Sequence, residues 1–407
     1  MTALDAPKVA AEPVPSVDAR VKGGTRMFSG WLPRTLTIVV FLALVLAPLN
    51  VGSPFLLTLL TTTGISAIGA IGLNVVTGHA GLVSLGHSFY IGIGAYAAVG
   101  LGSKMGLPLI VWLLGAIVAG AIAGALTGPF AARLRGIYLL VLTLGLVYIG
   151  VYLFTNWRSL SGGPAGTSAE PGLSLGFLDF NALRVGNVQY SRTQGLCVLI
   201  WLLVAAAMIF VKNVTRTRFG RAMRAMHDSH IAAETIGVNL LRTKTGALAI
   251  GGALGGLAGA LYVAQVTYVS PSNFDINMAV QYVVIIIVGG TATSYGPVVG
   301  AAIVSAVPLL ITQYAAHLPF IETSLSGGAA GLSAGAFSQI VYGVILIAFL
   351  VAEPRGCVSL IARAGRSAAA LVRGRRGEVG GPPTRDERAA EVLTVEGEED
   401  KPRPSLT

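Results

Sequence analysis

The chain has 407 residues, of which 54% are hydrophobic and only 11% charged, and its mean hydropathy is +0.73. This composition excludes a water-soluble globular protein and is typical of a chain with several membrane spans. The net charge of +10 would suggest nucleic acid in a soluble protein, but here the basic residues lie in tails and between apolar runs, where membrane orientation explains them. We therefore expect membrane lipids as partners and no nucleic acid.

The chain begins with a polar segment, 1–34, which we expect to be a disordered cytosolic leader. A transmembrane domain, 35–352, follows, and each span needs roughly 20 apolar residues to cross about 30 Å of hydrocarbon. The boundaries near 82–103 and 278–315 are the weakest, and either stretch could be re-entrant. The expected fold is an all-α polytopic membrane protein with about ten transmembrane helices. The candidate spans are 35–50, 55–77, 82–103, 108–131, 137–156, 195–211, 245–266, 278–294, 297–315 and 338–352.

Charge between the spans predicts their orientation. Positive side chains concentrate in the leader, in the segment 212–244 and after residue 352, whereas the segment 156–194 carries few. Because Lys and Arg are retained on the cytosolic side, both termini and 212–244 should be cytosolic, and 156–194 should be an external loop. The tail, 353–407, is first basic and then acidic, and we expect it to be disordered.

Glycines recur four residues apart in two of the spans. Such ridges let helix backbones approach each other closely, so we interpret them as packing surfaces rather than as substrate contacts. They are Gly120, Gly124 and Gly128 in one span, and Gly251, Gly255 and Gly259, flanked by Gly252 and Gly256, in another.

The segment 212–244 is the only long polar stretch between spans, and its first part predicts an amphipathic helix. Phe219, Met223 and Met226 recur at i, i+4 and i+7, which places them on one helix face. The opposite face carries Arg221 and Arg224.

The same segment predicts a second, shorter helix. Asp228 or Ser229 can cap it at the start of 231–236, and Gly237 supplies the left-handed residue that ends it. So short a helix buries little by itself, so we expect it to dock on a lipid surface or, as the better interpretation, in a protein groove. The expected docking residues are Arg221, Arg224, Ile231, Ala232, Ala233, Ile236 and Gly237.

Two kinds of residue pattern are missing from the sequence. The spans hold essentially no Asp, Glu, Lys or Arg away from their ends, whereas ion-coupled carriers place such residues within the membrane. No G-x-x-x-x-G-K-[ST] loop is present to hold nucleotide phosphates. We therefore expect no catalytic residue and no cofactor in this chain. If ATP drives transport, ATP and Mg belong to a separate subunit.

Several segments follow one another in an order that is typical of one protein family. They are GLNVVTGHAGLVSLGHSFYIGIGAY (Gly72–Tyr96), RGIYLLVLTL (Arg135–Leu144), SLSGGPAG (Ser159–Gly166), TRFGRAMRAMHDSHIAAETIGVN (Thr217–Asn239), VSPSNF (Val269–Phe274), VGGTATSYGPVVGA (Val288–Ala301) and YGVILIAFLVAEPRG (Tyr342–Gly356). Together they resemble the permease subunits of the branched-chain amino-acid ABC importers, specifically the LivM-like branch. The resemblance covers about 35–356.

The resemblance implies a non-enzymatic permease subunit in the bacterial cytoplasmic (inner) membrane. Its implied partners are a homologous permease, two cytosolic ATPase subunits and an extracytoplasmic substrate-binding protein. In ABC importers an E-A-A-x3-G loop forms the coupling helix, and Ile231 here replaces the glutamate while Gly237 retains the glycine. Outside the membrane, the family's T-G-G motif corresponds to Ser161, Gly162 and Gly163.

The cargo implied by the resemblance is leucine, isoleucine and valine. An importer of urea or short-chain amides is the alternative within the class, because the binding protein selects what is delivered. A stand-alone ion-coupled carrier or channel is less in keeping with spans that lack carboxylates. A purely structural scaffold would leave the capped and glycine-terminated helix of 212–244 without a purpose.

The stretch Gly72–Tyr96 combines polar side chains with glycines at membrane depth. Irregular backbone is tolerated there only against protein or a water-filled cavity, so we expect this stretch to line or shape the translocation path, with plain interhelical hydrogen bonding as the alternative. The two histidines, eight residues apart, fit no metal-binding signature, and no metal is expected. The candidate path residues are Asn74, Gly78, His79, Gly81, Ser84, Gly86 and His87.

Overall fold

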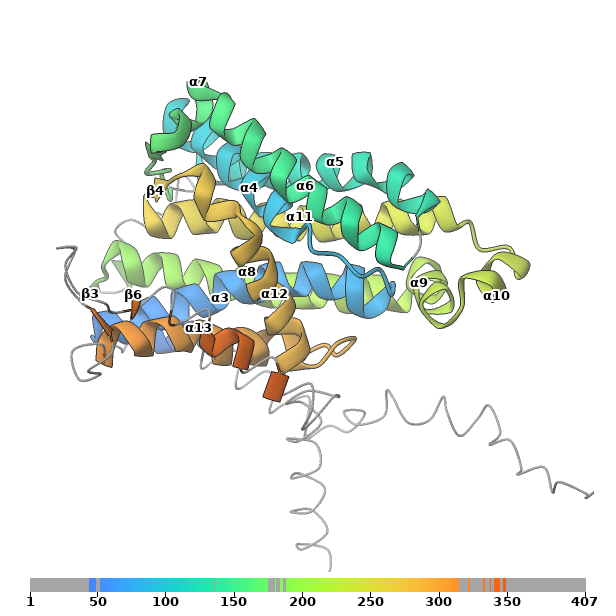
Figure 1. Cartoon of the computed structure of the whole chain (residues 1–407). Coiled ribbons are helices and arrows are strands. Elements are labelled where there is room, and N and C mark those ends of the chain that lie inside the picture. Colours follow the sequence, from blue (N-terminus) through green and yellow to red (C-terminus); the bar gives the residue numbers. More distant parts are fainter. Residues whose placement is uncertain are drawn as a thin grey trace, which may run out of the picture. The chain divides into compact units, whose positions relative to one another are not determined.

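Figure 1 shows the computed structural model of the chain. The structure describes residues 44–48, 52–134, 136–174, 180, 184–185, 188–314, 321–322, 332–333, 337, 340–344 and 347–348, all within the compact unit Met1–Val358. The leader 1–34 and the tail 353–407 lie outside the described residues. So does most of the first and last candidate spans, 35–50 and 338–352, and these parts remain predictions.

In the described part of the chain, six helices are long and apolar enough to cross a membrane. They confirm an all-α polytopic fold, and α6 begins and ends where the apolar run predicts, while the count of ten spans stays a prediction. The six are α3 (Pro54–Asn74) with the π turn η1 (Val75–His79), α5 (Leu109–Arg133), α6 (Ile137–Asn156), α8 (Arg192–Arg216), α11 (Leu240–Val266) and α12 (Ile276–Gly289) with the 3-10 turn η4 (Pro271–Phe274).

The expected span 82–103 is not one continuous helix. The chain leaves η1, turns at Gly81 with φ 69°, and runs irregularly until α4 (His87–Ala98) begins, and α4 then ends in the π turn η2 (Val99–Lys104). The sequence marks this boundary as weak and possibly re-entrant, but its many glycines do not show at which residue the helix breaks. The span expected at 297–315 forms α13 (Gly296–Tyr314). Its apolar part, Gly296–Ile311, is shorter than the six helices that are long enough to cross a membrane.

The remaining elements are short. Strand β1 (Thr167–Ser168) pairs antiparallel with β4 (Tyr268–Val269), β2 (Arg184–Val185) pairs antiparallel with β3 (Val188–Gln189), and β5 (Ile321–Glu322) pairs parallel with β6 (Leu332–Ser333). The short helices are α7 (Arg158–Ser161), η3 (Gly163–Ala165), α9 (Arg218–Asp228) and α10 (His230–Thr235).

Helix α11 is the most buried of the six candidate spans and packs against α3, α4 and α5. Its glycines make this possible: a methyl group at Gly252 would lie 2.2 Å from the carbonyl oxygen of Gly120 on α5. On another face of α11, a methyl group at Gly259 would lie 1.9 Å from the carbonyl oxygen of Ile91 on α4. The predicted glycine ridges are therefore confirmed as packing surfaces.

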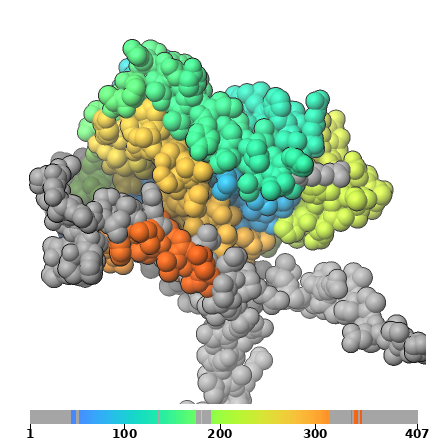
Figure 2. All heavy atoms as spheres, viewed as in Figure 1, coloured from blue at the N-terminus to red at the C-terminus, as the bar shows by residue number. Residues whose placement is uncertain are grey.

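Helices α9 and α10 lie at one end of the long helices, and α7 with β4 lies at the other (Figure 1). In the space-filling view the yellow-green surface of this α9–α10 end stands apart from the green surface around α7 (Figure 2). The segment 212–244 differs from the expected loop, because α8 continues to Arg216 and α11 already begins at Leu240. Lys244 is thus a helix residue, and it is fully buried.

Candidate functional site

The α9–α10 end is built from local caps. The side chain of Thr217 accepts from Gly220 N at the start of α9, and that of Ser229 accepts from Ala232 N at the start of α10. Ser229, rather than Asp228, is therefore the second cap. Gly237 ends the hairpin with φ 84°, as the sequence predicts, in the left-handed region that favours glycine.

Helix α9 turns its apolar face toward its own chain. Met223 and Met226 are fully buried, and the ring of Phe219 packs beside Gly246 of α11. This face is therefore already occupied and is not a docking surface. Two arginines of α9 also fold back, Arg221 onto Arg216 O at 3.4 Å and Arg224 onto Thr215 O at 3.2 Å, where they satisfy carbonyls at the end of α8.

Helix α10 presents the opposite arrangement. Ile231 and Ile236 are 70% and 72% exposed, and Ala232 is exposed beside them. Ala233 is 1% exposed, and its carbonyl accepts from Val238 N at 2.9 Å, so it packs within the chain. The surface left for another molecule is therefore made by the two isoleucines and Ala232, without Ala233.

A buried lysine near the start of α11 contacts the end of α5. Lys244 Nζ lies 3.1 Å from Ala131 O and 3.0 Å from Leu134 O, with Ala132 O at 3.5 Å. These carbonyls lie at the C-terminal end of α5, where carbonyl groups carry partial negative charge, so an ammonium group stabilises them. Ala131 O also accepts from Leu134 N at 3.3 Å. Sequence reasoning missed this role, because a lysine at the edge of an apolar run also fits a cytosolic loop.

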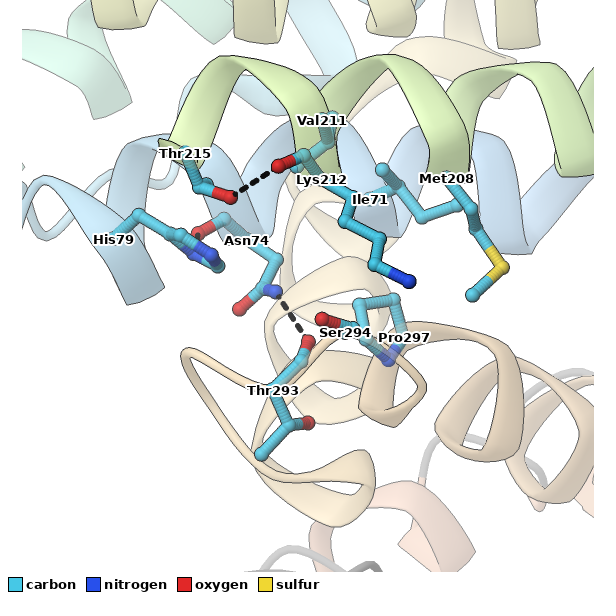
Figure 3. A pocket seen from close by; sticks show the side chains of 10 residues that line it. All are labelled: Ile71, Asn74, His79, Met208, Val211, Lys212, Thr215, Thr293, Ser294 and Pro297. Atoms are coloured by element: carbon cyan, nitrogen blue, oxygen red, sulfur yellow. Dashed lines mark hydrogen bonds between the residues drawn. The ribbon is translucent and has the colours of Figure 1, made fainter. Parts of the chain in front are cut away.

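The irregular stretch after α3 is held against the turn between α12 and α13. Asn74 Nδ2 donates to Thr293 O at 3.0 Å (Figure 3). Asn74 Oδ1 accepts from Ala292 N at 2.9 Å. A methyl group at Gly78 would lie 2.5 Å from the same Ala292 N, so glycine is needed for this approach. Asn74 thus has both halves of its amide satisfied by one turn.

The other candidate path residues pack against three different helices, namely α9, α6 and α12. Gly81 lies against α9, since a methyl group there would be 2.7 Å from His227 Nδ1, and half-buried His79 belongs to the same corner. Gly86 is buried against α6, because a methyl group at this position would lie 3.1 Å from Thr143 O. The structure does not gather these side chains around one cavity.

Two of them are enclosed by the chain. His87 is 1% exposed and its ring lies 5.4 Å from that of Tyr282 on α12. Ser84 is 3% exposed and its Oγ accepts from Gly86 N at 3.2 Å. In this arrangement both shape the packing of the broken helix. Among the described residues no three His, Cys, Asp or Glu side chains gather closely enough to hold a metal ion.

The motif Ser161–Gly163 forms a hydrogen-bonded corner. Ser161 Oγ donates to Trp157 O and accepts from Gly163 N, both at 3.0 Å, while Gly162 and Gly163 each have φ 76°. The corner is then tied to the segment after α11, because β1 pairs with β4 and a methyl group at Gly166 would lie 2.5 Å from Val269 O. The serine and glycines are thus explained by backbone geometry, and pairing with residues 268–269 is what sequence reasoning missed.

Six long apolar helices, packing through glycines and an irregular break between η1 and α4 are the features of a polytopic all-α membrane protein. The sequence matches, over residues 55–350, the family described as branched-chain amino acid transport system / permease component. This chain belongs to that family.

Curated relatives extend this assignment. The chain is 30% identical over 313 residues to the high-affinity branched-chain amino acid transport system permease protein LivM of Salmonella typhimurium, which covers 74% of this chain and 69% of the relative. It is 28% identical over 249 residues to the autoinducer 2 import system permease protein LsrC of an Enterobacter species, covering 58% and 67%. It is 26% identical over 282 residues to the ribose import permease protein RbsC of Escherichia coli, covering 67% and 82%.

Proposed function

We propose that this chain forms the translocation path of an ATP-driven importer and that α10 is the element through which a separate ATPase subunit moves it. The observation that carries this proposal is the exposure of Ile231, on a helix of six residues that is capped at both ends, and of Ile236, which directly follows that helix. Two isoleucines exposed to water are unfavourable, and an apolar groove on a partner would cover them.

The coupling proposal is tested by Ile231→Asp, with Ile231→Val as the matched control that keeps a branched apolar side chain. Because the Ile231 side chain is 70% exposed and is not part of the chain's own core, neither change should impair membrane insertion. Ile231→Asp should lower uptake and the yield of copurified ATPase by about tenfold, as expected for placing a charge in an apolar groove. Wild-type ATPase retention and uptake in Ile231→Asp would contradict the proposal.

Branched-chain amino acids are the proposed cargo, because the relative with 30% identity is named for them. Relatives named for ribose and for autoinducer 2 show that permeases of this kind serve different cargo, and urea or short-chain amides remain the alternative. Uptake by cells that carry the whole importer should be competed by leucine, isoleucine and valine. Competition by urea, amides or ribose alone would reassign the cargo, and uptake by this chain alone in liposomes would favour a stand-alone carrier.

We further propose that the irregular segment between η1 and α4 borders the path. Its Val83 side chain is 50% exposed, whereas Gly86 is buried against α6. Val83→Trp should therefore reduce uptake by narrowing the path while leaving the amount of assembled permease unchanged. Gly86→Leu should instead lower the amount of assembled protein, because the added atoms meet the backbone of Thr143. Unchanged uptake in Val83→Trp would leave the segment with packing as its only role.

The proposed orientation places α9, α10 and both termini in the cytosol and β1 on the external side of a bacterial inner membrane. It is supported by the positive charge of 212–244 and by the separation of the two ends in Figure 1. Single cysteines at Ser229 and Ser168, both exposed, should react with impermeant reagents from opposite sides of the membrane. Labelling of both from one side would overturn this topology.

A further inference from the structure

A small pocket lies at the α9–α10 end, between α3, α8 and the turn that joins α12 to α13. Its apolar side includes Ile71, Met208 and Pro297, and its polar side includes Lys212, Thr215 and Ser294 (Figure 3). The coupling proposal does not use it, since α10 does not line it.

The hydrogen-bonding groups around this pocket are largely taken. The Asn74 amide is satisfied by Ala292 and Thr293, as described above. Thr293 Oγ1 donates to Gly290 O at 2.7 Å and accepts from Gly296 N at 3.1 Å. Thr215 Oγ1 donates to Lys212 O at 3.0 Å. These groups build the walls and leave little capacity for a ligand.

Two donors remain unused within the described part of the chain. Both residues are exposed, and neither the Lys212 ammonium nor the Ser294 hydroxyl has a hydrogen-bond partner among the described residues. Figure 3 shows the lysine side chain directed toward the α12–α13 turn, which carries Ser294. Among the described residues, no Asp or Glu lines the pocket. Arg224 and His227 lie close enough to His79, a lining residue, to interact with it electrostatically. The pocket therefore offers positive charge and donors without a matching acceptor.

We propose that this pocket binds a phosphate group, with Lys212 and Ser294 as its donors, and that the phosphate is the headgroup of an anionic phospholipid. A phosphate supplies the acceptor oxygens that the two donors lack. The source is inferred from the other side of the pocket: half-buried Met208 offers apolar surface for the glycerol and acyl region, which a free phosphate does not need. Basic pockets between spans at the membrane surface suit such headgroups.

Binding here would link two elements that the chain joins only indirectly. Lys212 lies on α8, whereas Ser294 lies on the turn that Asn74 holds against the end of α3. A bound phosphate would contact both, so the lipid becomes a bridge between α8 and the α12–α13 turn.

The test uses the chain purified with its copurifying subunits from membranes containing phosphatidylglycerol. Native mass spectrometry would count retained phosphatidylglycerol in wild type, Lys212→Gln, Lys212→Arg and Ser294→Ala. Arg216→Gln is the matched control, because it removes an exposed positive charge one turn further along α8 from a residue that does not line the pocket. A second arm adds inorganic phosphate to delipidated protein, and a third replaces phosphatidylglycerol with phosphatidylcholine.

We expect Lys212→Gln to weaken phosphatidylglycerol retention about tenfold, as for loss of one charge-assisted hydrogen bond, with Lys212→Arg and Arg216→Gln close to wild type. Ser294→Ala should show a smaller loss. Equal binding of inorganic phosphate and no preference for phosphatidylglycerol over phosphatidylcholine would overturn the lipid source. Equal loss in Arg216→Gln and Lys212→Gln, or loss in neither, would overturn the site itself. None of these readouts depends on uptake, so they do not stand or fall with the coupling proposal.

Discussion

Helices α11 and α6 are both long and apolar enough to cross a membrane, yet the chain buries them to very different extents. Of the most apolar 18 residues, 78% are buried in α11 and 28% in α6, although α6 is the more hydrophobic helix. In water the more hydrophobic helix would be the inner one. In a membrane, lipid satisfies apolar side chains equally well, so burial follows the small residues that let backbones meet.

The two helices also differ in what they expose. On α6, Val141, Tyr148 and Tyr152 are 59%, 60% and 73% exposed, and they lie along one side of the helix at spacings of seven and four residues. On α11, the exposed large hydrophobic side chains are confined to its ends, at Leu241 and Val266. Helix α11 is therefore the centre of this chain's own packing, and α6 is a surface available to lipid or to another subunit.

The largest effect that would test this comparison is expected from Gly252→Ala on α11. Its new methyl group would lie 2.2 Å from the Gly120 carbonyl oxygen, where backbone and not a flexible side chain must move. We expect a loss of about 3 kcal/mol in the free energy of unfolding, measured in mixed micelles. A variant as stable as wild type would show that close α11–α5 contact is not what buries α11.

The matched control is Gly145→Ala on α6. Apart from the backbone of α6 itself, no atom of the described residues lies within 4 Å of a methyl group at this position, and alanine is the better helix former. The free energy of unfolding of the isolated chain should stay the same or rise by up to about 1 kcal/mol. If Gly145→Ala weakened only the assembled importer, the exposed face of α6 would be a subunit contact.

A smaller loss is expected from Lys244→Met at the start of α11. The change removes an ammonium group from the carbonyls of Ala131 and Leu134 and should lower the free energy of unfolding by about 2 kcal/mol. Arg242→Met is the control, since Arg242 is exposed on the same turn and should change stability little. Equal losses in both variants would mean that net charge, rather than the hydrogen bonds from Lys244 to the end of α5, determines the change in stability.

Local signals in the sequence predicted local structure well. The apolar run 137–156 gave the bounds of α6, and the order of Ser229 and Gly237 predicted where α10 begins and ends. These features depend on neighbours within one helical turn, which a sequence shows directly. The coupling, path and external-loop roles remain predictions, although the geometry of each is now described.

Contacts between distant residues were not predictable in the same way. The break before α4 depends on the conformation of Gly81, and one glycine among many in that stretch carries no mark of it. The burial of Lys244 depends on where α5 ends, and the partner of Asn74 lies on another helix pair. A single sequence names such polar residues as unusual but does not say which backbone groups satisfy them.

The hydrogen bond from Asn74 to Thr293 also bears on how the chain is made. The two residues are 219 positions apart, so α3 is synthesised long before the turn that satisfies its terminal amide. Membrane insertion of α3 and completion of its end must therefore be separate events. A chain stalled before α12 would hold an asparagine without the α12–α13 turn to pair with it. The last third of the protein thus finishes the folding of its earliest described span.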